Sequence, residues 1–167
     1  MPPMATHFAD LDGSVNDRHI AYYVERARGG VGYITSEHTG VLKQGRAFPN
    51  MTLIDTDQQI PSFKKLVEAI HQESGKIVIQ INHAGRQTSS SVTGSPIVAP
   101  SAIPCPVRKE MPHAISFEEI QKIVEAFGEA ARRVKETGAD GVEIHMAHGY
   151  LINQFLSPFS NKRKDEY

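Results

Sequence analysis

The chain has 167 residues, with 18 Lys and Arg against 19 Asp and Glu, and a single cysteine. This charge balance gives no field that would attract nucleic acid or an anionic membrane, and one cysteine excludes an intramolecular disulfide. No apolar run approaches the roughly 20 residues of a membrane span, and no signal-peptide pattern opens the chain. We therefore expect a cytoplasmic protein whose partner is a small molecule.

The chain alternates between predicted helices and strands. Asn16 is placed to cap a helix from Asp17 to Arg28, which Gly29 and Gly30 end. Short apolar runs at 31–36, 76–83 and 142–146 predict strands, and apolar residues at helical spacing predict helices over 55–74 and 116–137. This alternation predicts a parallel α/β sheet with right-handed crossovers. No Gly-x-Gly-x-x-Gly follows a strand, which argues against a Rossmann nucleotide site.

Residues 84–115 form a long segment rich in Ser, Pro and Thr. A connection of this length in a compact domain is either a functional lid or a surface loop without such a role, and both interpretations stay open. His19, His71 and His113 fall on predicted helix or loop surface, so we expect them to be solvated.

The strongest functional signal lies at the carboxyl end of the last predicted strand, where His145, His148 and Tyr150 come close together. In parallel α/β sheets, catalytic groups gather at this end of the strands. Two imidazoles and a phenol form a set of hydrogen-bond donors with a titratable member. Polar residues that only satisfy their surroundings are one alternative. A metal site of Glu143, His145 and His148 is another, because carboxylate and imidazole suit zinc.

From His145 to Asn161 the sequence reads HMAHGYLINQFLSPFSN. This stretch closely resembles the strand-four signature of the Old Yellow Enzyme family of FMN-dependent oxidoreductases, which includes the NADH:flavin oxidoreductases and 2,4-dienoyl-CoA reductases. The resemblance runs along essentially the whole chain. That family folds as a (β/α)8 barrel, and a complete barrel needs about 250 residues. The resemblance thus implies an α/β fold that is a partial TIM barrel, with roughly strands two to four and the end of strand one.

The resemblance also implies roles for residues at matching positions. The cofactor would be FMN, reduced by NAD(P)H, and the substrate would be an activated alkene such as an enone or a dienoyl thioester. His145 and His148 match the pair that hydrogen-bonds the substrate carbonyl, and Tyr150 matches the proton donor. His7 is expected to line the substrate-binding mouth. The residues expected at the flavin are Pro3, Met4, Ala5, Gln80, Arg86 and His38, the last standing where the family usually has a small residue.

The family's FMN phosphate site would follow strands seven and eight, which these residues do not include. We therefore expect residues 1–167 to be the N-terminal portion of a single FMN-binding domain, truncated at both ends. The implied macromolecular partner is a complementing half-barrel or a second copy in a homo-oligomer. A 4Fe-4S cluster is expected only in a longer parent protein. Two alternatives stand beside the oxidoreductase: a metal-dependent barrel hydrolase and a half-barrel without catalysis of its own.

Overall fold

The computed structural model describes residues 1–167, and its centre is a parallel sheet of four strands. The strands are β1 (Ile34–Thr35), β2 (Thr39–Gly40), β3 (Ile77–Asn82) and β6 (Gly141–Ile144). The middle strand, β3, pairs with β1 near its start and β2 near its end along one edge, and with β6 along the other. Thr35 N–H donates to the carbonyl of Met1 at 3.0 Å, so the first residue continues the sheet beside β1.

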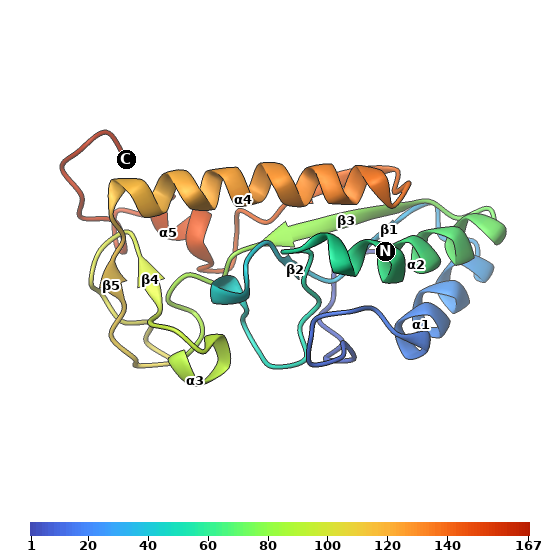
Figure 1. Ribbon diagram of the computed structural model, residues 1–167, viewed down its shortest axis with the longest axis horizontal. Helices are drawn as coiled ribbons and strands as arrows, with labels where there is room; N and C mark the ends of the chain where they lie inside the picture. Colours follow the sequence, from blue (N-terminus) through green and yellow to red (C-terminus); the bar gives the residue numbers. More distant parts are fainter.

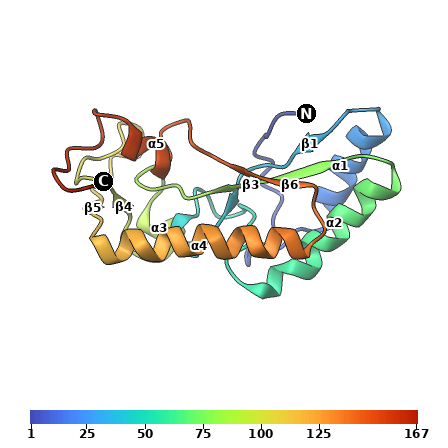
Figure 2. The ribbon, with the colours of Figure 1, turned by 90° about the horizontal axis from the view of Figure 1, so that it is seen from above.

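Helices cover one face of this sheet (Figures 1 and 2). The three long helices are α1 (Asp17–Arg28), α2 (Ile60–Gln72) and α4 (Phe117–Glu136). The short ones are α3 (Ser90–Thr93) and α5 (Leu151–Leu156), and 3₁₀ turns occur at Lys43–Gly45 and Asp57–Gln59. The Asn16 side chain caps α1, and Ser116 and Glu119 form a reciprocal capping box at α4. The predicted helices are confirmed, although a 3₁₀ turn replaces the start of the second.

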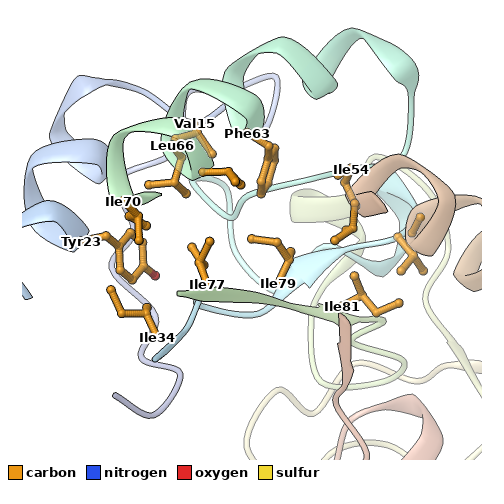
Figure 3. Packing of buried hydrophobic residues seen from close by; sticks show 14 of the residues in the cluster. Val15, Tyr23, Ile34, Ile54, Phe63, Leu66, Ile70, Ile77, Ile79 and Ile81 are labelled. Carbon is orange, nitrogen blue, oxygen red and sulfur yellow. The ribbon is translucent and has the colours of Figure 1, made fainter. Parts of the chain in front are cut away.

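Side-chain alternation along β3 separates an apolar face from a polar one. Ile77, Ile79 and Ile81 are almost fully buried and point toward the helices, where they join Phe63 and Leu66 of α2 in the main core cluster (Figure 3). Since successive strand residues point to opposite faces, Gln80 and Asn82 project on the side away from this core. The polar side of β3 is therefore available for a site.

The long segment 84–115 forms a separate small unit. It carries α3 and the strands β4 (Val98–Ala99) and β5 (His113–Ala114), which pair in parallel as a two-stranded sheet. Figure 1 shows this unit at the opposite end of the molecule from α1. The predicted strand over 31–36 was too long, because only Ile34 and Thr35 pair with β3 and the preceding Tyr33 is exposed.

The outer side of β6 is apolar and open. β6 pairs only with β3, and Val142, Ile144 and Met146 are 37%, 51% and 49% exposed. Beside them a groove of about 310 Å³ has only hydrophobic residues in its lining, contributed by α4, β6, α5 and Tyr167. No helix combines the length and apolar character that crossing a bilayer demands.

Candidate active site

The sheet brings His38, His145, His148 and Tyr150 together at the carboxyl ends of its strands. His145 extends the β6 ladder, since its N–H donates to the carbonyl of Ile81 at 3.0 Å. Its ring centroid lies 4.9 Å from that of Tyr150 and 5.0 Å from that of His148. His38, which follows β1, has its ring 5.1 Å from Tyr150 and 5.9 Å from His145. Residues predicted separately from the sequence thus share one cluster.

His145 and His148, which follow β6, each direct one ring nitrogen toward the other. The backbone N–H of Ala147 donates to His145 Nδ1 at 3.2 Å, so the proton of the neutral ring lies on Nε2. His145 Nε2 is 3.2 Å from His148 Nδ1. His148 has a φ of 58°, and this left-handed turn curls it back over His145. Burial and the neighbouring His148 lower the pKa of His145, which favours the neutral form of its ring.

Tyr150 is placed by the start of α5, where it is the N-cap residue. Its ring is partly buried, and desolvation raises the pKa of its phenol above the ordinary value of 10.0, although a hydrogen bond with Gln87 opposes this shift. The phenol therefore keeps its proton at neutral pH and is able to act as an acid toward a strong base.

The polar face of β3 adds two amides to the site. Gln80 lies opposite Glu143 in the sheet register, and its Nε2 donates to Glu143 Oε1 at 2.5 Å. Asn82 Nδ2 lies 2.9 Å from His38 Nδ1, while Asn82 Oδ1 is buried without a partner. An unpaired buried acceptor beside a second amide suits a ring whose edge carries both donors and acceptors, as the isoalloxazine of a flavin does.

The N-terminal segment is anchored by a group that the sequence analysis missed. Thr6 donates to the Glu37 carboxylate twice, from its N–H at 2.6 Å and from Oγ1 at 2.8 Å. This contact fixes the position of Pro3, Met4 and Ala5 just before it. The same carboxylate lies against His19, which is buried, so the prediction that His19 is solvated was wrong. His19 lies at helical spacing from Tyr23 and Ala27 on the buried face of α1, and this spacing is the signal that could have identified it as buried.

The remaining predicted residues have different surroundings. His7 is exposed, and its ring lies 3.9 Å from that of Phe48. Arg86 is buried, and its guanidinium donates to the carbonyls of Ile103 and Pro104 at 3.0 and 3.3 Å. The side chain thereby ties the long 84–115 segment to the end of β3.

Glu143, proposed as a ligand in the metal alternative, instead accepts from Gln80. No three His, Cys, Asp or Glu side chains come together in an arrangement that could hold a metal ion. The cluster at the end of β6 consists of donor rings rather than a ligand set.

The sequence pattern of the NADH:flavin oxidoreductase / NADH oxidase family matches residues 1–167. The chain belongs to this family. It is 47% identical over 169 residues to the NADH oxidase of Thermoanaerobacter brockii, with all of this chain and 26% of that protein covered. It is 42% identical over 167 residues to the NADPH dehydrogenase of Clostridium acetobutylicum, with all of this chain and 49% of that protein covered.

Solved structures agree with this membership. Morphinone reductase superposes with a TM-score of 0.93 at 33% identity, covering 100% of this chain and 48% of that one. The Old Yellow Enzyme of Pichia sp. AKU4542 superposes with a TM-score of 0.94 at 30% identity, covering 99% of this chain and 46% of that one. The family resemblance and the partial TIM barrel are thereby confirmed. The chain spans about half the length of these flavin oxidoreductases.

Proposed function

We propose that this chain supplies the substrate-binding side of an FMN-dependent oxidoreductase that uses NAD(P)H to reduce an activated alkene, such as an enone or a dienoyl thioester, in the cytoplasm. The observation that carries the proposal is the convergence of His145 Nε2 and His148 Nδ1 at 3.2 Å, beside the Tyr150 ring. Family membership supports the flavin and the nicotinamide as partners.

His145 and His148 bind the carbonyl oxygen of the substrate. When hydride adds to the carbon β to a carbonyl, negative charge builds on that oxygen, and donors already aimed at it stabilise the charge. His145 offers its Nε2 proton, and His148 offers a proton from Nδ1 once its tautomer changes to release the contact between the two rings. Because the lowered pKa keeps His145 neutral, the site holds a polarised carbonyl without fixing a full charge beside it.

Tyr150 provides the proton that completes the reduction at the α carbon. Its raised pKa keeps the phenol protonated until a strongly basic carbon develops next to it. His7 and Phe48, whose rings stack at 3.9 Å, form the outer rim of the mouth.

One side of the flavin would be held by Gln80, Pro3, Met4, Ala5 and His38. The Gln80 amide and the unpaired Asn82 Oδ1 are suited to its polar edge. FMN, when bound there, would supply the hydride-transfer chemistry that side chains do not provide. Arg86 would support the flavin site only indirectly, because its guanidinium donates to the carbonyls of Ile103 and Pro104.

The open edge of β6 and its apolar groove receive a complementing half-barrel. An unpaired parallel strand with exposed Val142 and Ile144 is prone to pairing with a further strand, and the groove beside it accepts an apolar helix face. A second copy of the chain is the alternative occupant, and solution mass separates the two.

The test is visible absorption of the purified protein after FMN addition and desalting, followed by enone-dependent NADPH oxidation. We expect retained flavin, and turnover that Tyr150→Phe lowers by about 100-fold or more while His113→Ala, an exposed control, leaves it unchanged. Retained flavin with Tyr150→Phe as active as wild type would refute the assignment of the proton donor. No flavin retained under any condition would refute FMN binding by this protein.

A further inference from the structure

The His38 imidazole packs against the ring of Tyr150. It is 7% exposed, and its ring lies 5.1 Å from that of Tyr150 with an interplanar angle of 31°. His145 approaches the same phenol ring edge-on, at 4.9 Å and 88°. One imidazole therefore covers a face of the tyrosine, and the other meets it at right angles.

Asn82 holds the His38 imidazole in this position. Its Nδ2 lies 2.9 Å from His38 Nδ1, and both groups are buried. The Asn82 backbone is itself fixed, because its carbonyl accepts from Val41 N–H at 3.0 Å and Gly40 lies opposite it in the β2–β3 register. Since Asn82 Oδ1 has no partner, His38 is the only group that holds this side chain amide. The imidazole is thus attached to the central strand of the sheet.

We propose that His38, held by Asn82, is a positioning residue that fixes the Tyr150 ring against His145. The proposal rests on the function proposed above only for its catalytic consequence, since the contact itself involves no flavin. Burial lowers the pKa of His38 to about 4, so at neutral pH the covering ring is uncharged and adds no charge of its own beside the phenol.

Loss of this contact should slow only the half-reaction in which Tyr150 delivers a proton to the substrate. Proton delivery depends steeply on geometry, and a displacement of about 1 Å can slow such a step by on the order of 100-fold. Truncating His38 opens space on one face of Tyr150, so the phenol becomes free to turn away from the substrate. Reduction of the flavin by NAD(P)H does not use the phenol, so a displacement of Tyr150 does not slow it.

The test uses protein labelled with ¹³Cζ-tyrosine. The chain contains five tyrosines, and Tyr150→Phe assigns the resonance of interest. We expect His38→Ala and Asn82→Ala to shift or broaden the Tyr150 resonance in the flavin-free protein, while the exposed control His113→Ala does not. Asn82→Ala retains the His38 ring and removes only the amide that holds it, so it keeps the test valid if His38→Ala fails to fold.

In protein saturated with FMN, we expect both variants to slow alkene-dependent oxidation of the reduced flavin by about tenfold or more beyond any change in the rate of flavin reduction by NADPH. The double variant should be no slower than His38→Ala alone, because both substitutions act through one ring. An unchanged Tyr150 resonance in both single variants overturns the positioning role. Failure of the wild type to bind FMN overturns the proposed function instead, and leaves the resonance to decide this inference.

Discussion

His19 Nε2 lies 2.5 Å from Glu37 Oε1, and the two side chains are only 1% and 2% exposed. This buried pair joins α1 to the end of β1, and Thr6 adds two further donors to the same carboxylate. The backbone N–H of Glu37 donates to the Tyr23 hydroxyl oxygen at 2.7 Å, which adds a second contact between α1 and the end of β1. The buried Glu37 carboxylate and its partners depend on one another, because removing any one of them leaves a buried charge or donor unpaired.

Removing Glu37 should therefore be severely destabilising. We expect Glu37→Ala to lower the free energy of unfolding by about 3 to 5 kcal/mol, because it leaves buried donors unpaired. Glu73→Ala is the matched control: Glu73 pairs with the exposed Arg28, and its loss should cost about 1 kcal/mol or less. Urea denaturation measures both values. Equal effects of the two substitutions would show that the buried pair is not an anchor.

Two buried histidines should make the protein sensitive to mild acid. Burial lowers the pKa of His38 and of His83 from 6.5 to about 4. Above pH 6.5 both histidines are neutral in the folded and in the unfolded protein. Between pH 6.5 and 4 these histidines bind protons in the unfolded chain but stay neutral in the folded one, so the free energy of unfolding falls as the pH falls. The loss is on the order of 3 kcal/mol for each histidine by pH 4.

Thermal unfolding followed from pH 7.5 to 4.5 measures this loss. We expect the melting temperature to fall across this range, and His83→Gln, which has no titrating ring, to fall less. A melting temperature independent of pH in the wild type would contradict the buried, neutral state of these rings.

The carbonyl-binding histidines should act as a pair. We expect His148→Ala to weaken alkene reduction by about 2.7 to 4 kcal/mol in transition-state stabilisation, since one of two converging donors is lost. Steady-state kinetics with an enone measures this as a fall in kcat/KM, and flavin content serves as the control. A variant that loses flavin along with activity would assign His148 to the cofactor instead.

Arg86 should restrict the motion of the 84–115 segment. Its guanidinium donates to the carbonyls of Ile103 and Pro104. We expect Arg86→Ala to increase hydrogen exchange across 100–110 without affecting β3, whereas the exposed Arg108→Ala leaves exchange unchanged. Arg86→Lys should rescue poorly, because an ammonium does not reproduce the planar fork of the guanidinium. Unaltered exchange in Arg86→Ala would remove this role.

Local pattern and one long motif account for most of what the sequence predicts. Helical spacing and the Ser116 capping box locate α4, and the run of isoleucines locates β3, because both signals lie in consecutive residues. The motif after His145 identifies the cluster at the end of β6. The likeness to the family then supplies the partial barrel, which strand order alone does not specify.

Pairings between distant residues escape the sequence. His19 and Glu37 are 18 positions apart, and His38 and Asn82 are 44 apart, so no local spacing joins them. Helical spacing groups His19 with the buried Tyr23 and Ala27, but it does not identify Glu37 as the partner of the imidazole. Arg86 likewise finds carbonyls in a loop whose path has no periodic pattern to predict it.

The central claim is that residues on the polar face of β3 bind FMN, and quenching of FMN fluorescence on titration with the protein tests it most directly. We expect saturable quenching by the wild type, a dissociation constant about tenfold higher for Gln80→Ala because one amide contact of about 1.4 kcal/mol is lost, and no change for His113→Ala. Saturable quenching that is identical in Gln80→Ala, or no quenching at all, would contradict the assignment of this face to the flavin.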